Sequence, residues 1–226
     1  MTAAEWSALR VTLFVGLGAL ALALPAGIAL GSLFARRRFP GKAFAEALVF
    51  LPLVLPPVVT GYLLLVVLGR QGWLGALLHR GLGIEMVFSY TGMVIAGAVV
   101  GLPLLVRSVR VAVEGVDPGL VDAARTLGYS RRRAFFRITL PLARPGILAG
   151  ALLAFARALG EFGATVMVAP NLPGTRTLAL EIFRQASVPG GEAAVARLAV
   201  ISITLSVIAL WITESIIGRR RGENRT

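Results

Sequence analysis

The chain has 226 residues, of which 57% are hydrophobic and 15% are charged, and its formal net charge is +12. Soluble domains usually carry about 45–50% apolar and about 25% charged residues, so this composition excludes most classes of water-soluble enzyme. With no cysteine and a single histidine, the sequence also excludes disulfides, thiolate metal sites and histidine clusters, and we expect no bound metal.

Long stretches without charge predict membrane-spanning helices. Residues 11–35, 47–69 and 86–106 contain no charged side chain. A run of about 20 apolar residues crosses the hydrocarbon core as a helix. Two more apolar stretches follow, the first of them interrupted by two charges. We predict an all-α membrane protein, a bundle of about five spans in one domain (1–226), with the spans over approximately 9–35, 46–69, 87–111, 145–169 and 198–218.

Proline interrupts the second predicted span. Residues 51–57 read Leu-Pro-Leu-Val-Leu-Pro-Pro, and each proline removes a backbone donor and bends a helix. In a membrane such breaks persist only where neighbouring helices or an internal cavity satisfy the freed carbonyl groups. The pattern therefore favours a packed bundle over independent membrane anchors.

Basic residues are distributed unevenly between the predicted loops. Sixteen of the 23 lysines and arginines fall around 36–42, in 107–144 and near the C-terminus, whereas six fall in the alternate segments. Cytoplasmic loops are enriched in Lys and Arg, so the bias predicts an external N-terminus and a cytoplasmic C-terminus. The positive charge then needs no nucleic-acid partner.

The sequence contains no energy-converting motif that we recognise. A phosphate-binding loop would read G-x-x-x-x-G-K-[ST], but the only lysine, Lys42, is followed by Ala43. A proton relay would normally place several acids or histidines within the membrane, whereas the spans hold one acid at depth, Glu161. We expect a non-enzymatic chain without its own nucleotide site or cofactor.

The loop 114–144 predicts a helical hairpin. Asp117, followed by proline, is a typical helix start, and Gly128 supplies a left-handed stop. A second helix is expected over 131–140, ending at Pro141. From the pattern alone, the hairpin is either an amphipathic element resting on lipid headgroups or an element that another protein grips.

The sequence of this hairpin resembles a known motif. It is similar to the "EAA" loop of the permease subunits of binding-protein-dependent ABC importers, with Asp where that pattern has Glu. In that family the loop docks on the ATPase subunit. The resemblance therefore implies an ATPase-coupling role for Asp122, Ala123, Ala124, Leu127, Gly128, Arg131, Phe135, Phe136, Leu140 and Pro141.

Three further segments extend the resemblance over nearly the whole chain. Residues 51–62, 155–165 and 171–177 look like the corresponding segments of molybdate transporter permeases, and sulfate permeases share parts of the last two. The resemblance implies a type I ABC importer permease in the cytoplasmic (inner) membrane, which transports molybdate or tungstate. A sulfate or thiosulfate permease is the alternative within transport, and a non-transporting membrane scaffold is the alternative from another class.

The same resemblance implies the partners. Two copies of the chain would form one translocation pathway as a homodimer, driven by two ABC ATPase subunits that bind the ATP. An extracytoplasmic molybdate- or tungstate-binding protein would deliver the cargo.

Two charged residues lie within the fourth predicted span. Arg157 and Glu161 are spaced i, i+4 and can form an ion pair, and a lone charge at mid-bilayer costs about 2.5–3.5 kcal/mol on insertion scales. The structural interpretation is that the pair neutralises itself. The functional interpretation is that Arg157, with Thr165 nearby, faces the pathway and attracts an oxyanion. The sequence favours the first and leaves the second open.

The predicted external segment 170–197 carries polar residues that could dock a binding protein. Its candidates are Asn171, Arg176 and Arg184. An ordinary solvated loop is the alternative interpretation, and the sequence does not separate the two.

Overall fold

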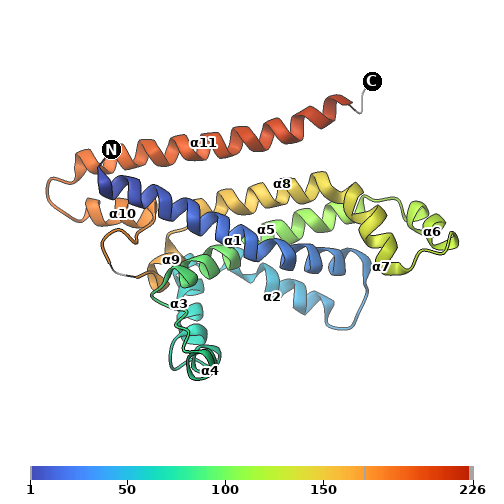
Figure 1. The fold of residues 1–226 in the computed structure, drawn as a ribbon, viewed down its shortest axis with the longest axis horizontal. Helices are drawn as coiled ribbons and strands as arrows, with labels where there is room; N and C mark the ends of the chain where they lie inside the picture. The colour runs from blue at the N-terminus through green and yellow to red at the C-terminus, as the bar shows by residue number, and fades with distance from the viewer. Residues whose placement is uncertain (1, 171, 224–226) are drawn as a thin grey trace.

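The computed structural model describes residues 2–170 and 172–223, and every regular element within them is helical. The predicted all-α class is confirmed. Figure 1 shows long helices that run side by side, with short helices at both ends of the bundle. In chain order the helices are α1 (Ala3–Arg36), α2 (Lys42–Val54), α3 (Pro57–Leu68), α4 (Trp73–Leu82), α5 (Tyr90–Glu114), α6 (Pro118–Thr126), α7 (Arg131–Ala134), the π-helix η1 (Phe135–Thr139), α8 (Leu140–Leu159), α9 (Gly163–Val168), α10 (Leu178–Ala186) and α11 (Glu192–Glu223).

The core of the bundle lies where α1 and α8 pack against α5. Leu105 and Val109 of α5 are fully buried there. Glycines allow the close approach: a Cβ atom added at Gly31 of α1 would lie 2.7 Å from the Cβ of Val109. Lipid tails are as apolar as leucine, so helices in a bilayer associate through such close packing of small residues.

The second predicted span is a bent pair and not one continuous helix. α2 and α3 meet at 118° across a short break. The break falls at Pro56 and Pro57, which lack backbone donors and cannot continue the helix that ends at Val54. In Figure 1, α3 leaves the direction of the bundle and carries α4 away from it.

Two helix ends expected around the fourth span are wrong. The helix predicted over 131–140 does not end at Pro141 but continues through η1 into α8. A π-turn accommodates the proline, because Leu140 donates its N–H to the carbonyl of Phe135, five residues back. At the other end, the predicted span 145–169 is broken: α8 ends at Leu159, and the short α9 follows.

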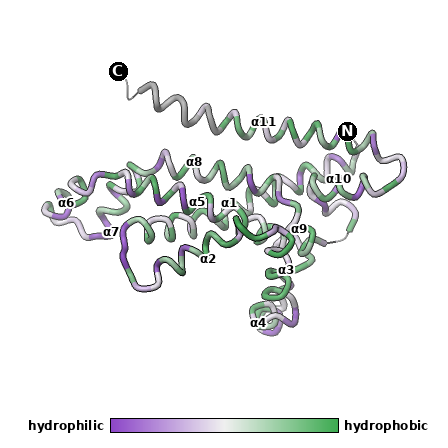
Figure 2. The backbone as a smooth tube through the Cα atoms, turned by 180° about the vertical axis from the view of Figure 1, so that it is seen from behind, coloured by the Kyte–Doolittle hydropathy of each residue, from purple (hydrophilic) through white to green (hydrophobic). Residues whose placement is uncertain are grey.

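Four described helices are long and apolar enough to cross a membrane, or five if the bent α2–α3 pair counts as one span. The five-span count therefore remains a prediction that depends on α2 and α3. Figure 2 shows a strongly hydrophobic tube along these two helices, and hydrophilic residues between α1 and α2 and around α6 and α7.

The two ends of the bundle differ in the elements they carry. The start of α1 lies beside α10 at one end, whereas α6 and α7 lie at the other (Figure 1). α11 starts near α10 and extends towards the end that holds α6. α11 exposes several large apolar side chains, which suits contact with lipid or another chain: Val200, Ile203, Val207 and Trp211.

Candidate functional site

The break between α8 and α9 brings the two intramembrane charges together. Arg157 Nη1 lies 2.6 Å from Glu161 Oε2, so the ion pair predicted from their spacing is present. The other carboxylate oxygen, Oε1, accepts a hydrogen bond from the backbone N–H of Ala164 at 2.7 Å. Glu161 is 3% exposed, and it thus links the last turn of α8 to the first turn of α9.

The break also contacts α3, a contact that sequence reasoning missed. A Cβ atom added at Gly61 would lie 2.6 Å from the carbonyl oxygen of Ala164, and one added at Gly163 would lie 2.6 Å from the Cβ of Pro57. The two backbones are therefore in direct contact. Beside this contact, Thr60 is 4% exposed, and its hydroxyl oxygen has no hydrogen-bond partner.

Of the three predicted intramembrane residues, Arg157, Glu161 and Thr165, only Arg157 has an accessible side chain. The Arg157 side chain is 32% exposed, whereas its partner Glu161 is nearly covered. Thr165 lies on α9 and is 1% exposed, so it lines no open surface in this conformation. An oxyanion that reached this level would meet the guanidinium before either of the other two side chains.

At one end of the bundle, local signals build the α6–α7 hairpin. Asp117 accepts a hydrogen bond from the N–H of Gly119 at 2.8 Å and caps α6. Gly128 has φ +88, the left-handed conformation that its position predicted. Ser130 then caps α7 through the N–H of Arg133. The predicted turn between two helices is confirmed, and α6 ends at Thr126, two residues before Gly128.

The hairpin exposes apolar side chains. Leu127 is 81% and Phe136 is 62% exposed, and the ring of Phe136 packs edge-on against Phe135 at 5.2 Å between centroids. Ala124 and Ala134 are buried. Of the remaining predicted coupling residues, Leu140 is half-buried and the exposed ones are Asp122, Ala123, Gly128, Arg131 and Pro141.

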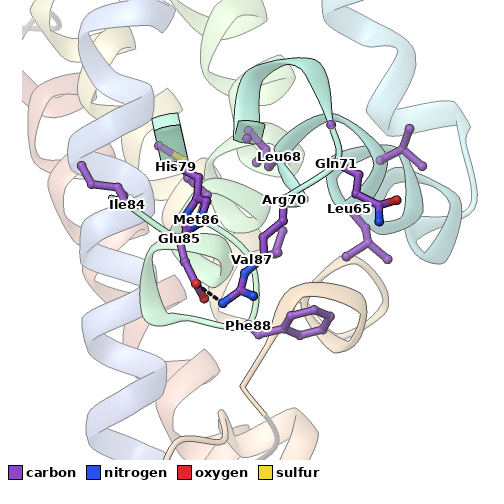
Figure 3. A pocket seen from close by; sticks show the side chains of 14 residues that line it. Leu65, Leu68, Arg70, Gln71, His79, Ile84, Glu85, Met86, Val87 and Phe88 are labelled. Carbon is purple, nitrogen blue, oxygen red and sulfur yellow. Dashed lines mark hydrogen bonds and ion pairs between the residues drawn. The ribbon is translucent and has the colours of Figure 1, made fainter. Parts of the chain in front are cut away.

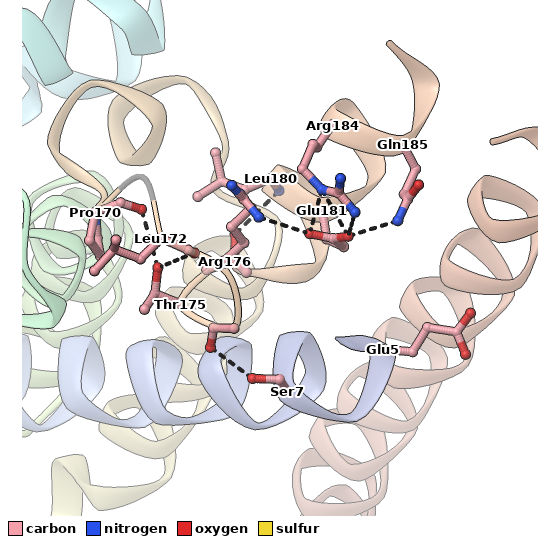
Figure 4. Close-up of polar contacts among 12 residues, drawn as sticks. Glu5, Ser7, Pro170, Leu172, Thr175, Arg176, Leu180, Glu181, Arg184 and Gln185 are labelled. Carbon is pink, nitrogen blue, oxygen red and sulfur yellow. Dashed lines mark hydrogen bonds and ion pairs between the residues drawn. The ribbon is translucent and has the colours of Figure 1, made fainter. Parts of the chain in front are cut away.

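At the opposite end of the bundle, a buried carboxylate forms ion pairs with the two arginines predicted for docking (Figure 4). Glu181 of α10 is 5% exposed; its carboxylate lies 2.6 Å from Arg184 Nη2 and 3.8 Å from Arg176 Nη1. Gln185 donates a further hydrogen bond at 2.9 Å. Sequence reasoning missed Glu181, and the predicted residue Asn171 lies outside the described residues.

The ionisation of Glu181 follows from these contacts. Burial raises the pKa of Glu181, but the hydrogen bonds from Arg184 and Gln185 and the nearby guanidinium charges outweigh burial and lower it. The pKa of Arg184 is raised chiefly by its hydrogen bond to Glu181. Glu181 is therefore ionised at neutral pH, and its contacts link residues within α10 and the loop that precedes it.

A second feature is a pocket of about 740 Å³ between the end of α3, α4 and the following loop (Figure 3). Arg70 and Glu85 form an ion pair across it, and His79 lies exposed at its edge. Phe88 has φ +54, a conformation rare for a bulky residue, and its N–H donates to the carbonyl of Val168 at 2.8 Å. That bond fixes the loop against α9.

Comparison with known proteins decides the family. Residues 24–222 match the family model described as "Binding-protein-dependent transport system inner membrane component". The chain belongs to this family. The permease is accordingly a multi-pass protein of the inner membrane and a membrane component of an ABC importer.

Curated relatives cover nearly the full permease. The molybdenum transport system permease protein ModB of Escherichia coli K12 is 51% identical over 95% of this chain and 94% of its own length. The ModB protein of Haemophilus influenzae is 46% identical over 93% and 92%. A chloroplastic sulfate permease of Chlamydomonas reinhardtii is 39% identical over 96% of this chain and 59% of its own.

Solved structures match the fold at low sequence identity. A bacterial alginate ABC transporter, in complex with an alginate-bound periplasmic protein, has a TM-score of 0.76 at 16% identity over 97% of this chain and 80% of its own. The MetNI methionine ABC transporter, inward facing, has a TM-score of 0.68 at 16% identity over 97% and 99%. These matches confirm the predicted type I importer fold.

Proposed function

We propose that the permease is the membrane subunit of a molybdate importer and that it also transports tungstate, which has the same charge and tetrahedral shape. The single observation that carries the proposal is the 51% identity to a molybdenum transport permease over nearly the full length of both chains. The sulfate permease relative is less similar and matches over a smaller part of its own length.

The α6–α7 hairpin is the proposed contact with the ATPase subunits. Leu127 and Phe136 are exposed apolar side chains at the tip of a bundle, and no described residue covers them. Such exposed patches mark interaction sites. The sequence has no phosphate-binding loop, so ATP would be bound and hydrolysed by two separate ABC subunits, and this chain would hold no cofactor of its own.

The proposed assembly is a homodimer with an extracytoplasmic binding protein. Exposed apolar side chains of α2, α3 and α11 provide surface for a second copy and for lipid. The binding protein would dock at the end that carries α10, close to Arg176 and Arg184 and to the loop that contains Asn171. That end would face outwards with the N-terminus, and the hairpin and the C-terminus would face the cytoplasm.

For the intramembrane pair we propose a structural role first. Glu161 is buried and uses both oxygens, one for Arg157 and one for the N–H of Ala164. The pair therefore holds α9 against α8. The partly exposed guanidinium of Arg157 gives passing oxyanions one weak contact, which suits a pathway that must release its cargo.

Reconstitution tests the proposed substrate. The permease is incorporated into liposomes with its ATPase subunits inside and a molybdate-binding protein outside, and uptake of molybdate, tungstate and sulfate is measured with ATP. We expect uptake of the first two, dependent on ATP and on the binding protein. Uptake of sulfate in preference to molybdate would assign the chain to the sulfate permeases, and failure of the ATPase to co-purify would favour a scaffold.

A further inference from the structure

The π-helix η1 joins the hairpin to the bundle, and it changes the spacing of the buried residues. Beyond η1, a series of residues spaced by four is buried: Thr139, Ala143, Ile147 and Ala151. The buried residue before this series is Ala134, five positions ahead of Thr139. The longer step falls on the π-turn, where Leu140 donates its N–H to the carbonyl of Phe135, five residues back. The π-turn therefore adds one residue to the helix at this point.

A regular α-helix through the same residues would present a different face. Phe136 would then lie seven residues, or nearly two full turns, before Ala143, and the two side chains would share one face. Ala143 belongs to the core where α8 packs against α1 and α5. In the structure, however, Phe136 is 62% exposed. The extra residue of the π-turn is what turns Phe136 away from the bundle.

Pro141 favours the π-turn over the regular helix. In an α-helix the residue at this position would donate its N–H to the carbonyl of Arg137, but proline has no N–H and its ring crowds that carbonyl. A proline alone does not require a π-turn, because Pro145 lies inside α8 without one. The spacing of the buried residues and the missing donor are therefore two separate observations, and both favour the same backbone.

We propose that Pro141 is a positioning residue, which acts through η1 to present Phe136 to the ATPase subunit. The inference rests on the proposed function of the hairpin and adds the cause of the orientation of this side chain. One residue in an α-helix corresponds to a rotation of about 100°. Loss of the π-turn would therefore rotate the hairpin by that angle relative to α8 and turn Phe136 towards the bundle.

The exposure of position 136 is measured by cysteine labelling. The chain has no cysteine of its own, so F136C introduces a unique thiol. Its rate of reaction with a water-soluble maleimide is compared in the full-length permease in detergent, with and without P141A. We expect P141A to slow labelling about fivefold, the change in population that one regained backbone hydrogen bond produces. P145A is the matched control, because it replaces a proline of the same helix beyond η1, and it should leave the rate unchanged.

Deletion of Arg137 tests the register independently. This exposed residue lies within η1, and without it Phe135 is four residues before Leu140, so the same hydrogen bond becomes an ordinary α-helical one. Deleting Arg137 in the P141A background should therefore restore fast labelling of F136C. If P141A alone does not elute as a folded species, deletion of Arg137 alone takes its place: it should fold and label at the original rate, and slow labelling would contradict the proposal.

Co-purification of the ATPase separates this inference from the proposed function. F136A and P141A should both lose ATPase at an unchanged membrane level, and deletion of Arg137 should restore the ATPase to P141A. Retention of the ATPase by F136A would remove Phe136 from the proposed ATPase contact, whatever the labelling rates are. Loss of the ATPase in F136A but not in a slowly labelled P141A would overturn the positioning role. An unchanged labelling rate in P141A, or equal slowing in P145A, would overturn it as well.

Discussion

Two of the helix breaks at glycine in the permease have sharply different surroundings. At Gly160, between α8 and α9, the neighbouring Glu161 is 3% exposed and both of its carboxylate oxygens have partners within the chain. At Gly128, between α6 and α7, the neighbouring Leu127 is 81% exposed. At the Gly160 break, the Glu161 carboxylate finds its partners within the chain. At the Gly128 break, an apolar surface is left that only another molecule can cover.

This difference reflects the two environments. Inside the bundle an unsatisfied charge or backbone group is costly, so the chain supplies the partners itself. Outside the membrane the backbone of a turn can rely on water, and its apolar side chains remain available for binding. The buried break therefore serves the fold and the exposed break serves recognition.

The largest effect is expected at the buried break. Glu161→Ala leaves Arg157 unpaired and removes the acceptor for the Ala164 N–H. Breaking a fully buried pair costs about 3–5 kcal/mol, and the 32% exposure of the Arg157 side chain lowers that figure. We expect a large loss of folded protein, measured as the monodisperse fraction in size-exclusion chromatography. The double replacement of Arg157 and Glu161 by alanine should recover part of it.

Normal folding of both single variants, with transport abolished, would show instead that the pair acts mainly in the pathway.

A smaller effect is expected where α3 touches α9. In Gly61→Ala the new methyl group would lie 2.6 Å from the Ala164 carbonyl oxygen, and overpacking of this kind costs about 1–3 kcal/mol. The melting temperature in detergent should fall. Gly81→Ala is the matched control, because a Cβ atom there meets nothing within 4 Å. An equal shift in both variants would contradict the close contact.

The cluster around Glu181 should make a pH-dependent contribution to the stability of the fold. The pKa of Glu181 is lower in the folded chain than its ordinary value, so its carboxylate stabilises the fold above the unfolded-state pKa. That contribution is lost as the pH falls through the lowered pKa. Glu181→Gln should melt below the unchanged chain at pH 7, and the two melting curves should converge in acid. A constant difference at every pH would show that packing, and not charge, is what the substitution removes.

Local signals in the sequence predicted the exposed hairpin well. Asp117 as a cap, Gly128 as a left-handed stop and the Arg157–Glu161 pair involve residues within a few positions of each other, so spacing alone identifies them. The prediction that the helix ends at Pro141 was wrong. A π-turn before Pro141 lets the helix continue past the proline, and helix propensities do not predict π-turns.

Contacts between residues far apart in the chain could not be predicted from the sequence. The contact of Gly61 with Ala164 joins residues far apart in the chain, and the gathering of Arg176 and Arg184 around Glu181 depends on how α10 folds back. Residue types at these positions were visible in the sequence, but their proximity was not.

Gly128→Val tests most directly whether the exposed break serves recognition. Because Gly128 has φ +88, a residue with a side chain there costs about 1–2 kcal/mol, which should shift α7 and misplace Phe136 without disturbing the bundle. Membrane level and co-purifying ATPase are measured in the same preparation, with Gly81→Val as the control. We predict a normal membrane level with most of the ATPase lost. A Gly128→Val permease that retains its ATPase and imports at the original rate would contradict the assignment of the hairpin as the coupling element.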